Sequence, residues 1–155
     1  MTTAVHNTAV YWDLDHLSPG RGAGTTPPPD GALVLLPGSA LTRAIDHAQV
    51  QRALGGACTI EGLLAQALER AGVELIETCG NHELPGRAMN GFVHIALDDM
   101  ALNPGIDTVV LVSMRSDVHA LASFVTRAGR RFTQLRCTAV LAAVPCPAVP
   151  ELEAA

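Results

Sequence analysis

Short apolar runs and longer amphipathic stretches alternate along this chain. Apolar runs rich in β-branched residues, such as residues 108–112, are typical of strands buried on both faces. Stretches with apolar residues on one face, such as residues 61–71, are typical of helices. The predicted strands are residues 8–12, 57–60, 73–78, 108–112 and 132–140. The predicted helices are residues 39–54, 61–71, 96–102 and 117–128.

The alternation of strands and helices predicts an α/β fold. Strands separated by helices form parallel sheets with helices on both faces, so we expect a three-layer α/β/α sandwich with a mainly parallel central sheet. The length of 155 residues suits one domain, which we place at residues 1–143. Within it, the Pro- and Gly-rich residues 18–38 are an insertion or lid, and residues 144–155 are a Pro-rich acidic tail. Gly72 and Gly129 are expected to end helices.

Composition excludes several classes of chemistry. All 10 basic residues are arginine, which removes mechanisms that need a catalytic lysine, such as Schiff bases and the phosphate-binding P-loop. The net charge of −5 gives the whole protein no attraction for nucleic acid, so any contact with RNA must be local. Aromatic residues make up 3%, which argues against a base-stacking surface.

The cysteines and the apolar runs indicate a cytoplasmic protein. The 4 cysteines lie far apart with no C-x-x-C pair, which is typical of free thiols in a reducing compartment. No secretory signal is recognisable at the N-terminus. No apolar run reaches the roughly 18–20 residues that a bilayer span needs, so no membrane partner is expected.

Acidic residues follow the two most convincing strands. Asp13 and Asp15 come after the first, and Asp117 comes after residues 108–112. Asp98 and Asp99 lie in the helix between them. Ligands of parallel sheets bind beyond the carboxyl ends of the strands, and acids gathered there suit Mg²⁺ or Mn²⁺. The alternative is that each acid acts alone, as a helix cap or on a solvated surface.

Three segments carry a resemblance to a known family. Residues 8–17, which contain Tyr-Trp-Asp-Leu-Asp-His, resemble the opening strand of NYN domains, a bacterial branch of the PIN-like nucleases. Residues 90–100 and 106–117, the latter ending in Ser-Met-Arg-Ser-Asp, resemble the second and third motifs of that family. The resemblance covers most of the chain outside the Pro-rich segment and the tail. It implies a PIN-like sandwich and metal-dependent cleavage of RNA phosphodiester bonds, with Mg or Mn as cofactor. The catalytic and metal-binding residues it implies are Asp13, Asp99 and Asp117.

The chain departs from the family pattern at three polar positions. His16 stands where the family has Asn, Val93 where it has Asp, and Arg115 where it has an acid aimed at the metal. A guanidinium repels a divalent cation and competes for its carboxylates. We therefore expect Arg115 to pair with Asp13 or Asp117 and to replace the charge of the metal. The alternative to a nuclease is then a catalytically silent PIN-like module for binding or dimerisation.

Three carboxylates can nevertheless hold one ion, so both hypotheses stay open at this stage. A histidine ligand such as His16 or His119 would shift the preference towards Mn²⁺, Fe²⁺ or Zn²⁺. The auxiliary residues of the candidate site are Asp15, His16, Asp98, Ser113, Arg115 and Ser116.

Other activities have weaker signals. Asp13 and Asp15 also resemble the nucleophile and general acid of a HAD-like phosphatase, but that family's usual lysine is absent. No Gly-x-Ser-x-Gly occurs to support a serine hydrolase. The candidate phosphate-binding residues are Arg127, Arg130 and Arg131, which could equally complement the dipole of a helix end. The high apolar content of 48% favours a homo-oligomer.

Overall fold

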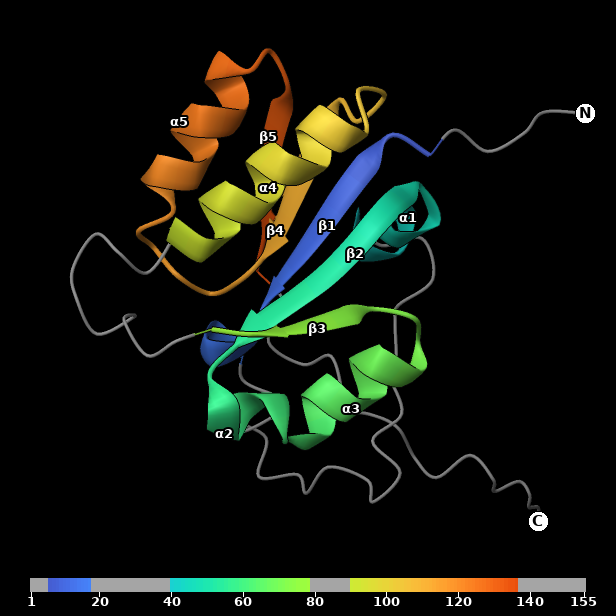
Figure 1. Ribbon diagram of the computed structural model, residues 1–155, viewed down its shortest axis with the longest axis vertical. Coiled ribbons are helices and arrows are strands. Elements are labelled where there is room, and N and C mark those ends of the chain that lie inside the picture. The colour runs from blue at the N-terminus through green and yellow to red at the C-terminus, as the bar shows by residue number, and fades with distance from the viewer. Residues whose placement is uncertain (1–5, 18–39, 79–89, 137–155) are drawn as a thin grey trace, which may run out of the picture.

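The computed structural model describes residues 6–17, 40–78 and 90–136. Its strands form one parallel sheet in the order β3-β2-β1-β4-β5, with helices on both faces (Figure 1). The strands are β1 (Thr8–Asp13), β2 (Ala48–Gly55), β3 (Glu74–Glu77), β4 (Thr108–Val112) and β5 (Arg131–Leu135). The helices are α1 (Ala40–Asp46), α2 (Ala57–Ile60), α3 (Leu63–Arg70), α4 (Asn90–Leu102) and α5 (His119–Arg127), with a short 3-10 helix η1 (Leu14–His16). The predicted α/β three-layer sandwich is confirmed.

The central strand β1 divides the core into two halves. All of its residues are buried, and successive side chains of a strand point to opposite faces. Val10 and Trp12 pack in the half covered by α1 and α3, whereas Ala9 and Tyr11 pack in the half covered by α4 and α5. A strand with apolar partners on both sides must lie in the middle of a parallel sheet.

The predicted helix at residues 39–54 is wrong in its second half. The helix α1 ends at Asp46, and the chain then forms β2, which pairs with β1 on one side and with β3 on the other. Helix propensity is a weak preference that tertiary pairing overrides. Here the backbone of β2 satisfies the buried edge of β1, and Ala53 and Leu54 are buried in the two halves of the core.

Residues 57–60, predicted as a strand, instead form the single-turn helix α2. The reason is a long-range cap: the carboxylate of Asp15 accepts hydrogen bonds from the Gly56 N–H at 3.2 and 3.3 Å and from the Thr59 hydroxyl at 2.5 Å. These contacts satisfy donors at the start of the turn, which favours the helical conformation.

Most of the other elements lie close to their predicted positions, but the strand predicted at residues 132–140 is β5, which ends at Leu135, and residues 137–140 lie outside the described part of the chain. The helix α3 falls inside the predicted range of 61–71, while α4 begins earlier than expected, at Asn90, because Phe92 and Val93 continue its buried face. Gly72 and Gly129 have φ values of 95° and 80°, which confirms that both end helices in the left-handed region. The predicted segments 18–38 and 144–155 lie outside the described residues.

Gly55 marks a close approach between the end of β2 and η1. A Cβ added there would lie 2.9 Å from the Cβ of Leu14, which the backbone fixes. We predict that Gly55→Ala lowers the free energy of unfolding by about 1–3 kcal/mol, since overpacking forces backbone shifts. Urea unfolding measures the change.

The matched control is Gly105→Ala, because a Cβ at Gly105 meets nothing within 4 Å and its φ is not positive. This variant should unfold within about 1 kcal/mol of the wild type. Equal effects of the two substitutions would contradict the close approach of β2 and η1.

Candidate functional site

The candidate site lies at the carboxyl ends of β1 and β4. The sheet order places β2 and β3 on one side of β1, and β4 and β5 on the other, so the direction of strand addition reverses between β1 and β4. Parallel sheets bind ligands outside such a reversal point. Asp13 is the last residue of β1 and Ser113 directly follows β4, so the two residues meet at this point.

Asp13 is a buried carboxylate held by two side chains. It is 3% exposed; its Oδ2 accepts a hydrogen bond of 2.8 Å from the Ser113 hydroxyl, and its Oδ1 lies 3.3 Å from Nδ1 of His16. Burial raises the pKa of the Asp13 carboxyl, while the hydrogen bond from Ser113 opposes the rise. Ser113 is fully buried and donates to a carboxylate instead of to a histidine, so it is not arranged as a nucleophile.

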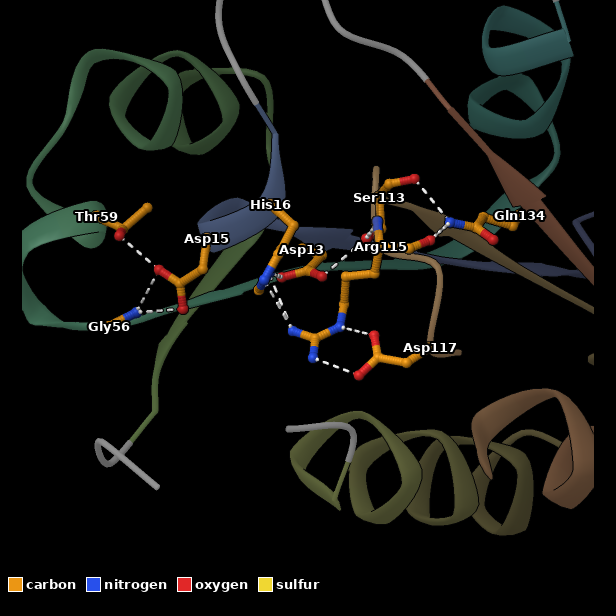
Figure 2. A network of polar contacts seen from close by, with 9 residues as sticks. All are labelled: Asp13, Asp15, His16, Gly56, Thr59, Ser113, Arg115, Asp117 and Gln134. Carbon is orange, nitrogen blue, oxygen red and sulfur yellow. Dashed lines mark hydrogen bonds and ion pairs between the residues drawn. The ribbon is translucent and has the colours of Figure 1, made fainter. Parts of the chain in front are cut away.

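Arg115 connects this carboxylate to the rim of the site (Figure 2). Its Nε and Nη2 donate to the two oxygens of Asp117 at 2.9 and 3.0 Å. Its Nη1 lies 3.1 Å from both ring nitrogens of His16, and its backbone N–H donates to the Ser113 hydroxyl at 3.0 Å. The prediction that Arg115 pairs with Asp13 or Asp117 is therefore confirmed, with Asp117 as the partner.

These residues form a closed ring of polar contacts. Nδ1 of His16 lies 3.3 Å from Oδ1 of Asp13, and Nη1 of Arg115 is equidistant from both nitrogens of the imidazole, so the guanidinium faces the imidazole ring and not a single nitrogen lone pair. The ring is completed through Ser113, which accepts from the Arg115 backbone and donates to Asp13. We call the four residues Asp13, His16, Ser113 and Arg115 the arginine ring.

Asp117 lies outside the ring, at its rim. Its side chain is 64% exposed, whereas that of Arg115 is 9% exposed. The hydrogen bonds from Arg115 lower the pKa of the Asp117 carboxyl and raise the pKa of the guanidinium. An ion pair with so exposed a partner adds little to stability.

Asp99, the third predicted metal ligand, is not brought to this site. It is 2% exposed and binds the Arg52 guanidinium through both oxygens, at 2.8 and 2.6 Å, while the Tyr11 hydroxyl donates to it at 2.7 Å. Arg52 also pairs with the exposed Glu74. Burial raises the pKa of Tyr11, and the bond to Asp99 raises the pKa of Arg52.

The direction of α4 explains the position of Asp99. Gly91, at the start of the helix, lies beside Leu54 and Thr78 near the carboxyl ends of β2 and β3. At its other end, Asn103 accepts a hydrogen bond of 2.9 Å from Gln49, near the amino end of β2. The helix therefore runs back along the sheet, and position 99 is carried about 9 Å further from the carboxyl edge than position 93.

The remaining predicted residues have separate roles. Asp15 caps α2, so both of its oxygens are engaged away from Asp13, which disfavours its use as a phosphatase general acid. Asp98, Ser116 and His119 are exposed. Within residues 6–17, 40–78 and 90–136, no group of three or more His, Cys, Asp or Glu side chains could hold a metal ion. The structure does not bring the three predicted carboxylates together, because Asp99 belongs to a different network.

The residues of the arginine ring do not fit a divalent ion. A metal at this position would have to displace the guanidinium of Arg115, which engages both oxygens of Asp117 and is nearly buried. The positive guanidinium would otherwise lie against the ion, which Coulomb repulsion opposes.

The candidate phosphate-binding arginines lie at the opposite end of the sheet. Arg127 ends α5 and Arg131 begins β5, where it pairs with Thr108 at the amino end of β4. Arg130 donates to the carbonyl oxygens of Ile106 and Ala128, which gives it a structural role. A phosphate bound by these residues would not lie at the arginine ring.

Gln134 is a site residue that the sequence did not indicate. Its side-chain amide donates to the carbonyl oxygens of Ser113 and Arg115 at 2.8 and 2.7 Å (Figure 2). No local pattern marks a glutamine on a strand as a loop anchor, because the contact depends on the pairing of β5 with β4.

No family model matches this chain, and neither curated proteins nor solved structures provide a match. None of the helices in the described part of the chain combines the length and the apolar character needed to cross a membrane.

The Arg52–Asp99 pair is expected to stabilise the fold. We predict that Arg52→Met lowers the free energy of unfolding by about 3 kcal/mol, because among the described residues it leaves the buried charge of Asp99 with the Tyr11 hydroxyl as its remaining side-chain partner. Chemical denaturation measures the change. Glu74→Gln is the control, since Glu74 is 61% exposed and its loss should change stability by less than about 1 kcal/mol. A similar loss in both variants would contradict the role of the buried pair.

The raised pKa of Asp13 predicts how the free energy of unfolding changes with pH. Because the native state holds this proton more tightly than the unfolded state, the contribution of Asp13 to stability is fully present below its usual pKa of 3.8. It is lost as the pH rises through the higher native value. The unfolding free energy of the wild type minus that of Asp13→Asn should therefore fall over this window. A difference that rises instead would mean that the ring stabilises the charged form overall.

Proposed function

We propose that this protein is a PIN-like, NYN-type module in which Arg115 replaces the catalytic metal, and that it acts by binding instead of by cleaving RNA. The observation that carries the proposal is the side chain of Arg115, which is 9% exposed and is bonded to both oxygens of Asp117 beside the buried Asp13 and the partly exposed His16. The resemblance of the motif segments to NYN domains supplies the family, and the geometry of the arginine ring favours the silent member over the nuclease.

A tethered cation reduces the repulsion between the acids at the carboxyl edge of the sheet without a metal. Asp13 and Asp117 both carry acidic groups near the ends of β1 and β4, and a cation beside them reduces their mutual repulsion. A guanidinium is suited to this because it stays charged at every relevant pH and presents several donors in a plane. The hydrolysis that the family resemblance implies uses a bound metal to activate water, which the tethered cation cannot do.

The expected partner is a macromolecule or a second copy of the chain. Among the described residues, α4 and α5 expose the large apolar side chains Leu97 (38%), Leu102 (78%) and Phe124 (42%), which supports contact with a protein surface. Homo-oligomer formation stays a prediction, as does contact of RNA with the arginines at the amino end of the sheet. The cytoplasmic location predicted from the cysteines is part of the same proposal.

Calorimetric titration with Mn²⁺ tests the replacement of the metal. The wild type should give no binding heat, because a divalent ion would have to displace the guanidinium. Arg115→Asp, which restores an acid at this position, should bind Mn²⁺ with a Kd of about 10⁻⁵ M, within the range in which carboxylate sites hold divalent ions.

The control variant combines Arg115→Asp with Asp13→Asn and should lose that binding. Micromolar binding to the wild type that disappears in Asp13→Asn would overturn the proposal and favour the metal-dependent ribonuclease. In that case RNA cleavage with Mn²⁺ should be measurable in the wild type and absent from Asp13→Asn.

A further inference from the structure

The loop that carries Arg115 is held from the neighbouring strand β5. Gln134 uses one side-chain amide to bind two carbonyl oxygens, those of Ser113 and Arg115, at 2.8 and 2.7 Å. A primary amide has two N–H donors, so these two contacts use its whole donor capacity. The neighbouring Arg136 makes longer contacts, at 3.5 Å to the Met114 oxygen and 3.3 Å to the Arg115 oxygen.

Backbone contacts also hold the same loop, one from β5 and one from η1. The Ser113 N–H donates to the Leu135 oxygen at 3.1 Å, which continues the pairing of β4 with β5. The Met114 N–H donates to the His16 oxygen at 2.9 Å, which joins the loop to η1. The orientation of the peptide groups around Arg115 is therefore fixed by contacts that do not involve the Arg115 side chain.

The fixed orientation of these peptide groups is important because the side-chain partners of Arg115 are exposed and hold it only weakly. Asp117 is 64% exposed, and an ion pair with an exposed partner scarcely offsets the loss of freedom of a long side chain. His16 is also partly exposed, at 38% for its side chain. The guanidinium is nonetheless nearly buried, so something other than these two partners must direct it.

We propose that Gln134 is a positioning residue that holds the guanidinium of Arg115 between His16 and Asp117 by fixing the backbone from Ser113 to Arg115. The inference rests on the proposed function, in which that guanidinium takes the place of a metal. It adds that the silent state of the site depends on a residue of β5 outside the three segments that resemble the family motifs.

The exchange of arginine side-chain protons with solvent tests this role by NMR. In the wild type the Arg115 Nε–H should exchange slowly, because it is bonded to Asp117 and nearly buried. Gln134→Leu and Gln134→Met both replace the amide, and with it the two N–H donors, by an apolar side chain of similar size. Each should accelerate exchange of the Arg115 Nε–H by about tenfold or more, since exchange rates report local opening.

The Arg52 Nε–H provides an internal reference, because it is bonded to buried Asp99 in a separate network. Its exchange should stay within about twofold of the wild type in both variants. Gln49→Leu is the matched control, since Gln49 is also a strand glutamine with a side-chain contact, at 2.9 Å to Asn103. It should leave the Arg115 Nε–H unchanged.

The outcomes separate this inference from the proposed function. Slow exchange of the Arg115 Nε–H in the wild type and in both Gln134 variants overturns the role of Gln134 only. Equal acceleration of the Arg52 and Arg115 protons also overturns it, because Gln134 would then support the whole fold. Fast exchange of the Arg115 proton in the wild type contradicts the proposed function itself.

Discussion

The hydrogen bond from the Ser113 hydroxyl to the buried Asp13 carboxylate joins the ends of the two central strands, and the carboxyl edge of the sheet is organised around it. A carboxylate removed from water is costly unless several donors satisfy it. Ser113 and His16 are those donors, and each also contacts Arg115. Arg115 therefore lies next to both of the groups that satisfy this buried acid.

The two arginine–aspartate pairs described above differ in their burial and in their effect on stability. Asp99 is buried, so its bidentate pair with Arg52 belongs to the core. Removing one partner of such a pair strongly lowers the stability of the fold. Asp117 is exposed, so its pair with Arg115 contributes little to stability. In both pairs the planar guanidinium donates to the two oxygens of one carboxylate. This lysine-free chain therefore uses arginine both for a contact in the core and for a fixed positive charge near the surface.

The elements that could be predicted are those whose structure depends on the local sequence pattern. Residues 108–112 are apolar on both faces and form the buried strand β4, and the glycines at 72 and 129 end helices as expected. The two elements of the wrong type fall between residues 47 and 60, where strand pairing with β1 and a cap from Asp15 decide the outcome. Such partners are distant in sequence, so periodicity over a short window does not detect them.

For the candidate site, the sequence by itself determined that acids follow the first and fourth strands and that Arg115 stands among them, because those residues are adjacent to strands in the chain. Only the tertiary structure decided which acids meet. The backward run of α4 carries Asp99 to Arg52, and the register of β5 against β4 brings Gln134 to the loop of Arg115. Helix direction and strand register are properties of packed elements, and no single segment of sequence specifies them.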